Sequence, residues 1–429
     1  MKRQQIPRRG FLSSTAAVVA VPTLVSGKAL GLDGNVAAND RIIVGAVGCG
    51  VRGYSAINFA LQASQCQIVA VCDVRRPRLV RAQEQCNAHY GRAGQKGTYK
   101  GCQAYHEYRD LLARDDIDAV ILTPPDHWHG VMYSDAIRAG KDMYAEKPVT
   151  RTIAEGQALR KLVKQYGVIF QTGTHSRSHA WIRHACELVR NGYLGKIHTI
   201  EVSVMCGREY PTIASSDPPK GFDYDRWTGP APYVPFDTKR CEWLAMYLIS
   251  HYCAGFIANW GVHFMDIAQW GCPEVTSKPF WIEGKGEFPA SGMTDSCNHW
   301  DTWLTYDSGL KVHFTDETKQ PNGCRFIGDE GWVKVNWKKP GFHASDPSLR
   351  NVQLRPGELR LHATPAASYF GHTLDLFNSM RTRQEPAAPF EAGHRATTIG
   401  NVADICVRLG RKLRWDWETE TFNDPQANA

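Results

Sequence analysis

A glycine-rich turn near the start of the chain constrains the fold more than any other feature. Gly48, Gly50 and Gly53 have the spacing G-x-G-x-x-G and follow the apolar run Ile42–Val47, while Tyr54–Ala63 after them has helical spacing. Glycines at these positions permit a tight turn and a close approach of the backbone to a pyrophosphate, and the start of a helix attracts its negative charge. The sequence therefore predicts a dinucleotide-binding turn between a strand and a helix.

An acidic residue lies where such a turn needs one, because Asp73 ends the next apolar run, twenty residues after Gly53. A carboxylate accepts hydrogen bonds from ribose hydroxyls and repels a 2′-phosphate, so NAD is the predicted cofactor. Arg75 and Arg76 follow closely, and arginine accommodates a 2′-phosphate, so NADP stays open as the alternative. The predicted cofactor-binding residues of this region are Gly48, Gly50, Val51, Arg52, Gly53 and Asp73.

Short apolar runs alternate with helix-like stretches from Arg41 to about Thr174. Runs rich in Val, Ile and Ala are typical of parallel strands that are buried on both faces. The alternation predicts a doubly wound α/β domain of the Rossmann type. The expected strands are Ile42–Val47, Gln67–Cys72, Asp118–Leu122, Met143–Ala145 and Val168–Gln171, and the expected helices are Tyr54–Ala63, Arg78–His89, Tyr105–Arg114, His129–Ala139 and Ile153–Tyr166.

The pattern changes after about Thr174, where long β-rich runs such as Ile197–Met205 and Trp300–Phe314 follow one another. Strands without intervening helices predict an α+β domain with a large, mostly antiparallel open sheet. A chain of 429 residues is also too long for one typical domain. We therefore expect an export signal and linker over residues 1–38, the dinucleotide-binding domain over 39–174 and a second domain over 175–429.

The first residues are typical of a targeting signal. Arg8 and Arg9 precede Gly10-Phe11-Leu12, an apolar stretch over residues 16–25 and then small residues. The paired arginines resemble a twin-arginine signal, whose pathway carries folded proteins, although the usual Ser or Thr before them is absent. We expect a periplasmic or other extracytoplasmic location, reached through the export machinery, and a cytoplasmic one if the signal is not used. The stretch is too short to span a bilayer, and no later one is long enough.

Charge and cysteine content exclude other classes. Five of the charges behind the formal +7 lie within the first 29 residues, and without them the formal charge is +2, which gives no case for a nucleic-acid partner. The thirteen cysteines include no C-x-x-C pair, which argues against a zinc ribbon or a thioredoxin-type site. In an oxidising compartment Cys86 and Cys102 can pair, whereas most of the others are expected to be buried free thiols.

A set of motifs resembles the Gfo/Idh/MocA family, the glucose-fructose oxidoreductase and inositol dehydrogenase group. The motifs are GCGVRG at 48–53, DIDAV at 116–120, TPPDHWH at 123–129, EKP at 146–148, WTGPAP at 227–232, WGVH at 260–263 and the end at Trp415-Asp416. The resemblance implies a Rossmann domain followed by a C-terminal domain whose open sheet serves in oligomerisation, which makes a homo-oligomer, a dimer or tetramer, the expectation. It also implies sugars, cyclitols or their derivatives as substrates.

The resemblance implies that Lys147 is the residue that contacts the reacting hydroxyl of the substrate. The lysine of the family's Glu-Lys-Pro motif contacts the reacting hydroxyl near the nicotinamide, and Lys147 follows a strand at the edge where open α/β sheets bind ligands. An ammonium beside an oxidised nicotinamide can shift toward a working pKa and exchange a proton. The same resemblance adds Pro124, His127, Trp128, Glu146 and Lys147 to the cofactor-binding residues.

The second family signature places an aspartate and a histidine four residues apart on one helix face. His263 matches the histidine, but Asn259 stands at the aspartate position. An asparagine can orient a substrate or an imidazole, but it carries no charge and takes no proton. Asp266, three residues after His263, can compensate from a neighbouring face. Lys147, His263 and Asn259 are therefore the candidate catalytic residues.

We expect no metal site, because no acid or cysteine at suitable spacing completes the pair His127 and His129. The thirteen tryptophans supply flat faces for the C–H edges of a sugar, although most are expected in the core. The candidate substrate-contacting residues are Trp227, Trp260, Asp266 and Arg177.

Three functions remain open from the sequence. The first is hydride transfer between a tightly bound nicotinamide cofactor and a secondary hydroxyl of a sugar, cyclitol or glycoside, with Lys147 taking the hydroxyl proton and His263 assisting. The second is an NAD-dependent glycosidase or lyase that oxidises transiently and then eliminates. The third is a nucleotide-bound binding protein without catalysis, which Asn259 leaves open.

Overall fold

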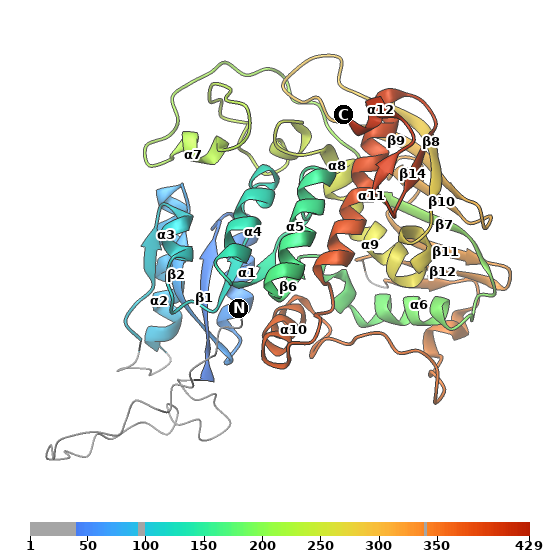
Figure 1. Ribbon diagram of the computed structural model, residues 1–429, viewed down its shortest axis with the longest axis horizontal. Helices are drawn as coiled ribbons and strands as arrows, with labels where there is room; N and C mark the ends of the chain where they lie inside the picture. Colours follow the sequence, from blue (N-terminus) through green and yellow to red (C-terminus); the bar gives the residue numbers. More distant parts are fainter. Residues whose placement is uncertain (1–39, 93–98, 339–340) are drawn as a thin grey trace, which may run out of the picture. The chain divides into compact units, whose positions relative to one another are not determined.

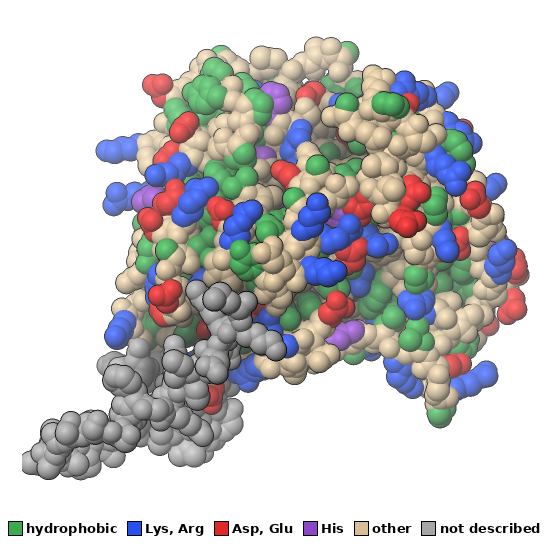
Figure 2. All heavy atoms as spheres, in the orientation of Figure 1, with side chains coloured by type: hydrophobic (Ala, Val, Ile, Leu, Met, Phe, Trp, Pro, Cys, Tyr) green, Lys and Arg blue, Asp and Glu red, His purple; other side chains and the backbone are tan. Residues whose placement is uncertain are grey.

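The computed structural model describes residues 40–92, 99–338 and 341–429 (Figure 1). The export signal expected over residues 1–38 lies outside this part of the chain. Residues 42–429 form one compact unit. Among the described residues no helix has both the length and the apolar character that a membrane span requires. On the face drawn in Figure 2, basic and acidic side chains are interspersed.

The first half contains a six-stranded parallel sheet with the strand order β3-β2-β1-β4-β5-β6. This order reverses between β1 and β4, which leaves a crevice at the carboxyl ends of those two strands. The strands are β1 (Ile42–Val47), β2 (Cys66–Cys72), β3 (Gln103–Tyr105), β4 (Ala119–Leu122), β5 (Asp142–Ala145) and β6 (Phe170–Thr172), and the helices that follow them are α1 (Val51–Leu61), α2 (Arg76–Arg92), α3 (Tyr108–Leu112), α4 (His129–Arg138) and α5 (Ile153–Tyr166).

Helices cover both faces of this sheet. Apolar residues of α1 and α2 pack on one face, together with Leu376 and Phe377 from α10 (Tyr369–Thr382), far along the chain. Residues of α3, α4 and α5 pack on the other face, joined by Phe390 at the start of α11 (Phe390–Leu409). The predicted doubly wound α/β fold is confirmed, and its layers are completed by two helices from the C-terminal part.

The second half contains a nine-stranded sheet with the order β13-β12-β11-β7-β10-β9-β8-β14-β15. Neighbouring strands in this sheet pair antiparallel, except β7 and β10, which are parallel. The predicted mostly antiparallel sheet is therefore confirmed. A large apolar core joins one face of this sheet to helices α6, α9 and α11. The elements are α6 (Ala180–Arg190), β7 (Ile197–Val204), α7 (Tyr224–Thr228), α8 (Gly255–Asn259), α9 (Gly261–Gly271), β8 (Phe280–Glu287), β9 (His299–Tyr306), β10 (Lys311–Asp316), β11 (Gly323–Gly328), β12 (Gly331–Val335), β13 (Phe342–Ala344), β14 (Leu413–Asp416), β15 (Thr421–Phe422) and α12 (Pro425–Asn428).

A long connection between β7 and α8, residues 205–254, runs past the first sheet, and we call it the cover segment. It holds α7 and a short 3₁₀ helix, Met246–Leu248, and it has a small apolar core of its own that includes Tyr224, Trp227 and Phe236. Figure 1 shows α7 beyond the ends of β2 and α3. The cover segment is therefore a packed part of the protein with a defined position over the first sheet.

One local expectation is wrong. Tyr105 belongs to the edge strand β3, and the helix expected from Tyr105 begins only at Tyr108. The three residues of β3 are mostly exposed, so no apolar run marks them. The β-rich run Trp300–Phe314 is two strands, β9 and β10, joined at a turn that contains Gly309. Cys86 and Cys102 are both buried and free, with their side chains in hydrogen-bond contact.

Candidate active site

The glycine turn follows β1 and begins α1. Gly48 has a φ of +85°, and a β-carbon there would lie 2.6 Å from the carbonyl oxygen of Thr123. At Gly53 a β-carbon would lie 1.8 Å from the carbonyl oxygen of Gly48, so only glycine fits without movement of the backbone. Helix α1 has no side-chain cap and no acid in its first turn. Its first N–H groups therefore face the turn with the positive end of the helix dipole, which suits a phosphate.

Asp73 lies at the carboxyl end of β2 and lines the same cavity. Its two carboxylate oxygens accept hydrogen bonds of 2.7 Å from the backbone N–H groups of Cys49 and Arg75. Burial raises the pKa of Asp73, although these two hydrogen bonds oppose the shift. The carboxylate keeps lone pairs free, and it is fixed in orientation beside the turn, as recognition of a ribose hydroxyl requires.

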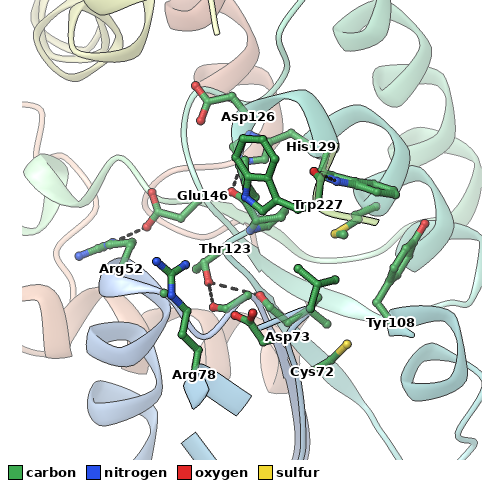
Figure 3. A pocket seen from close by; sticks show the side chains of 18 of the residues that line it. Arg52, Cys72, Asp73, Arg78, Tyr108, Thr123, Asp126, His129, Glu146 and Trp227 are labelled. Carbon is green, nitrogen blue, oxygen red and sulfur yellow. Dashed lines mark hydrogen bonds and ion pairs between the residues drawn. The ribbon is translucent and has the colours of Figure 1, made fainter. Parts of the chain in front are cut away.

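The two arginines that follow Asp73 point elsewhere. The guanidinium carbon of Arg75 lies 3.8 Å from the ring centroid of Phe222 in the cover segment, so this side chain is engaged in stacking. Arg76 is exposed. Arg78, on the first turn of α2, is the arginine that lines the cavity near Asp73 and Gly50 (Figure 3). The end of the cavity where a ribose would lie is therefore lined by the Asp73 carboxylate, with Arg78 beside it.

The cavity itself has a volume of about 140 Å³ and extends from the glycine turn to Lys147. The first sheet supplies one wall, and the cover segment supplies the other with Trp227, Trp243 and Tyr247. A glycine cradle that no β-carbon can share, an uncapped helix start and an oriented acid fit a nicotinamide dinucleotide. When bound, such a cofactor accepts or returns a hydride at its nicotinamide ring.

The loop after β4 connects this cavity with the cover segment. Pro124 and Trp128 line the cavity, and the ring nitrogens His127 Nε2 and Trp128 Nε1 each lie 2.9 Å from the carbonyl oxygen of Trp227. Burial lowers the pKa of His127 to about 4, so this imidazole is neutral at physiological pH. His129 contacts the carbonyl oxygens of Pro148 and Pro124. No group of metal-ligating side chains occurs among the described residues.

Arg52 and Glu146 form an ion pair behind the nicotinamide end of the cavity. Arg52 Nε donates to Glu146 Oε1 at 2.5 Å (Figure 3), and its Nη2 donates to the Tyr144 hydroxyl at 2.8 Å. Burial favours the neutral acid, but Arg52 overcomes this and holds the pKa of Glu146 below its usual value. Glu146 is therefore an ionised partner of Arg52, and its Oε2 accepts a 3.2 Å hydrogen bond from the backbone N–H of Lys147.

Lys147 is the second residue after β5, and its partly buried side chain lies at the wall of the cavity. Its Nζ donates to the backbone carbonyl of Asn259 at 3.0 Å and to Asn259 Oδ1 at 2.9 Å. The ring centroids of Trp260 and Tyr247 lie 5.5 Å and 5.9 Å from Nζ. Burial lowers the pKa of Lys147, and Asp126 and Glu146 oppose this shift. A lysine amine with a lowered pKa can exchange a proton near neutral pH.

His263 lies one turn beyond Asn259, on α9, and is buried among aromatic rings. The ring centroids of His175, Trp260 and Trp337 lie 5.5 Å, 5.8 Å and 5.1 Å from its own. Its Nδ1 has no hydrogen-bond partner in the described part of the protein. Burial, together with the nearby charges of Lys147 and Arg52, lowers the pKa of His263 well below its usual value. The imidazole is therefore neutral, and its unpartnered Nδ1 is enclosed by protein.

The remaining candidates separate into two groups. Trp227 lines the cavity and Trp260 lies beside Lys147, so both are near the site. Asp266 does not face Lys147, because it forms a buried bidentate ion pair with Arg177, with N–O distances of 2.8 and 2.7 Å. Neither Asp266 nor Arg177 lines the cavity, so Asp266 does not replace the missing aspartate at position 259.

Several site residues were not singled out from the sequence. Tyr247 and Trp243 lie in the cover segment, where no motif marks them, and Trp337 follows β12. Asp126 lies within the TPPDHWH motif, but its partner Asn259 is 133 positions away. The motif drew attention to its histidines, and only the folded chain shows that the aspartate points toward Asn259.

The fold, the glycine turn and Asp73 define a nicotinamide dinucleotide-binding protein, and Lys147 lines the cavity that these features form. Residues 42–174 match the NAD-binding Rossmann fold of the Gfo/Idh/MocA oxidoreductase family, and residues 180–429 match its C-terminal alpha/beta domain. The chain belongs to the Gfo/Idh/MocA oxidoreductase family, and its first domain is of the family's NAD-binding type.

Individual relatives are more distant. Glycosyl hydrolase family 109 protein 2 of Shewanella sp. (strain ANA-3) is 31% identical over 188 residues, which cover 43% of this chain and only 39% of the relative. The scyllo-inositol 2-dehydrogenase (NAD(+)) of Bacillus subtilis (strain 168) is 25% identical over 320 residues, which cover 72% of this chain and 76% of the relative. The WlbA dehydrogenase from Bordetella pertussis, solved with NADH and UDP-GlcNAcA, has a TM-score of 0.63 at 16% identity and covers 87% of this chain and 97% of its own. The last similarity shows a shared fold.

Proposed function

We propose that this protein transfers a hydride between its nicotinamide cofactor and a secondary hydroxyl of a sugar, a cyclitol or a glycoside. The observation that carries the proposal is the partly buried amine of Lys147, held near the carboxyl end of β5 by two hydrogen bonds from Nζ to Asn259. The amine lies at the cavity wall that also contains the glycine turn. A proton acceptor in this position serves an alcohol whose carbinol carbon faces the cofactor.

In such a reaction Lys147, His263 and Asn259 have different roles. Neutral Lys147 takes the hydroxyl proton as the C–O bond becomes a carbonyl, and protonated Lys147 returns it in the reverse direction. Burial lowers the pKa of Lys147 and so favours the neutral amine that accepts this proton. His263, which is neutral, assists by packing against Trp260, the ring that flanks the Lys147 amine. Asn259 holds the amine in place.

A polyhydroxylated ring as substrate is supported by the surroundings of Lys147 and by the relatives. The flat faces of Trp260 and Tyr247 flank Nζ, and such faces suit the C–H edges of a sugar or cyclitol. One relative acts on scyllo-inositol according to its name, and one similar structure holds a nucleotide-linked sugar acid. These likenesses favour carbohydrates or cyclitols over simple alcohols.

NAD, retained tightly, is the cofactor we propose. Asp73 faces the ribose end of the cavity, while Arg75 is engaged with Phe222. The cover segment, with its own core, forms a wall of the cavity and is tied to the loop after β2. We propose that residues 1–38 direct export of the folded, cofactor-loaded protein, and that the open second sheet joins copies of the chain into a dimer or tetramer.

The test uses protein expressed with residues 1–38 and recovered from outside the cytoplasm of a bacterial host. We expect denaturation to release NAD, identified by mass spectrometry. We expect the absorbance of reduced nicotinamide to rise on addition of at least one member of a panel of inositols, hexoses and N-acetylhexosamines. Lys147→Ala should keep the cofactor and lose this reduction by at least about a hundredfold. Protein without a dinucleotide would contradict the cofactor proposal, and unchanged reduction by Lys147→Ala would contradict the assigned role.

A second candidate function is glycoside cleavage by transient oxidation and elimination. It is favoured by the 31% identity to a relative named as a glycosyl hydrolase, although the match covers 39% of that protein. In this reaction oxidation of a ring hydroxyl acidifies the adjacent C–H, elimination expels the aglycone, and the hydride returns. Release of nitrophenol from nitrophenyl glycosides without net formation of NADH would support it over net hydride transfer.

A further inference from the structure

A buried carboxylate, Asp126, lies beside the active-site lysine and outside the signature that contains position 259 and His263. Asp126 follows the carboxyl end of β4, and its side chain is almost completely buried. Its Oδ2 accepts a 2.7 Å hydrogen bond from Asn259 Nδ2, and the Cys253 thiol also hydrogen-bonds to it. No backbone N–H of α4 donates to this carboxylate in the described part of the chain, so it does not act as a helix cap.

Asn259 connects this carboxylate to Lys147. Both polar atoms of the Asn259 side-chain amide form hydrogen bonds. Its Nδ2 donates to Asp126, and its Oδ1 accepts from Lys147 Nζ at 2.9 Å. An amide can pass polarisation between a donor and an acceptor but cannot hold the charge itself. The asparagine therefore links a buried carboxylate to a partly buried amine across two parts of the fold.

We propose that Asp126 is the positioning carboxylate of the active site, and that it supplies through Asn259 the negative charge that an aspartate at position 259 would supply directly. The inference rests on the proposed function of Lys147 as the proton-exchanging group. It explains why an asparagine at this position is compatible with catalysis, since the acid has moved from the helix that precedes His263 to the loop after β4.

The charges around Lys147 support this assignment. Glu146 is committed to Arg52 and Tyr144, with distances of 2.5 Å and 2.9 Å. By contrast, no arginine or histidine among the described residues forms an ion pair with Asp126. Burial lowers the pKa of Lys147, and Asp126 is the largest of the charges that oppose this. The titratable and charged groups that face Lys147 or lie beside it are Asp126, Glu146, Cys253, Arg52, Tyr247 and neutral His263.

The experiment measures the pKa of Lys147 in the cofactor-loaded protein, without any substrate. The lysine side chains are labelled with ¹⁵N, the Nζ resonance is assigned by its loss in Lys147→Arg, and its shift is followed with pH. Removal of a negative charge disfavours the ammonium, so Asp126→Asn should lower the pKa of Lys147 by about 1 unit or more. Asn259→Asp adds a negative charge and should raise the pKa.

A charge exchange separates this role from a merely structural one. The double variant Asp126→Asn/Asn259→Asp keeps one carboxylate and one amide in exchanged positions, and it should return the pKa of Lys147 to within about half a unit of the original. Asp225→Asn removes an exposed carboxylate from α7 and should leave the titration unchanged. Thermal unfolding and cofactor content identify variants that are folded and loaded.

Two results would overturn the proposal. One is an unchanged pKa of Lys147 in folded Asp126→Asn, and the other is a double variant in which the pKa is shifted as far as in Asp126→Asn. Because the titration needs no turnover, a failure of every sugar and cyclitol to reduce the cofactor would count against the proposed function alone. With a substrate in hand, the pH profile of cofactor reduction should shift in the same direction as the pKa in each variant.

Discussion

At Gly53 the addition of a single methyl group forces the backbone of the dinucleotide-binding turn to move. A β-carbon there would lie 1.8 Å from the carbonyl oxygen of Gly48 and 2.7 Å from Thr123 Oγ1. Because the first of these atoms is backbone, the turn itself must move. We expect Gly53→Ala to destabilise the fold by about 1–3 kcal/mol and to lose most of its bound dinucleotide. Urea unfolding and the nucleotide content of the purified protein measure the two effects.

Gly91 provides the matched control, because it is a helical glycine with open space around it. A β-carbon at Gly91, near the end of α2, meets no atom within 4 Å. Gly91→Ala should be neutral or stabilising by a few tenths of a kcal/mol, since alanine favours the helix. Equal losses of stability in the two variants would show that the steric explanation for Gly53 is wrong.

For individual residues, the sequence predicts a role where that role follows from a local motif. Gly48, Gly53 and Asp73 are fixed by a local strand–turn–helix pattern, and the structure brings them to one cavity. The contact between Asp126 and Asn259 spans 133 positions and has no local pattern. Long-range side-chain contacts depend on how the two halves pack, and a single sequence does not contain that information in a readable form.

Among the elements, the cover segment has the clearest expected effect on the cofactor. Phe222 stacks on Arg75, and the backbone N–H of the next residue, Asp223, donates to the carbonyl of Val74, beside Asp73. Phe222→Ala removes this stacking and part of the small core of the segment. We expect NAD to dissociate about tenfold faster, which corresponds to ~1.4 kcal/mol. Stopped-flow displacement of the bound dinucleotide measures the rate.

Tyr233 offers a control within the same segment, since 67% of it is exposed. Tyr233→Ala should leave the dissociation rate unchanged within about twofold, because surface substitutions outside packed regions have small effects. A dissociation rate in Phe222→Ala equal to that of the unaltered protein would mean that the cover segment does not retain the cofactor.

Helix α10 is fastened to β6 by a buried histidine, which gives the fold a predicted sensitivity to acid. His372 lies between the Ser178 hydroxyl at 2.8 Å and the carbonyl oxygen of Thr172 at 2.9 Å. Burial lowers the pKa of His372 to about 4 from the usual 6.5. As the pH falls from 6.5 to 4, the unfolded chain binds this proton and the folded protein does not, so stability decreases, by at most about 3 kcal/mol for this residue.

We therefore expect the free energy of unfolding to fall less steeply over this pH range in His372→Gln than in the unaltered protein. Urea unfolding at a series of pH values gives the slope, which separates the protonation effect from any constant loss of stability in the variant. His343→Gln, at an exposed position, should keep the original slope. An identical slope in His372→Gln would rule out the assigned contribution.

On the scale of the whole molecule, the sequence predicts the two kinds of sheet but not how the halves are interleaved. Alternating apolar runs indicate the first sheet, because fully buried parallel strands are apolar on both faces. The edge strand β3, with mostly exposed residues, lacks that signal. Helix α10, more than 190 positions after the expected boundary at 174, packs on α1, and no periodicity in its own sequence identifies that partner.

This interleaving leads to a prediction about the isolated first domain. A fragment of residues 39–174 lacks Leu376 and Phe377, which cover one face of the sheet, and it lacks Trp227 and Tyr247 at the cavity wall. Its exposed apolar surface should make it aggregate or bind a hydrophobic dye, and its affinity for NADH should be at least about tenfold weaker than that of the whole chain.

Dye fluorescence, light scattering and NADH titration test the fragment, and co-expression with residues 175–429 as a separate chain is the control. The second chain supplies α10 and the cover segment, so solubility and NADH affinity should both recover when the two are produced together. A monomeric fragment that binds NADH as tightly as the whole chain would mean that the first domain is complete without the second. In that case the contacts of α10 and the cover segment would serve substrate binding or stability, and retention of the cofactor would have to arise within residues 39–174.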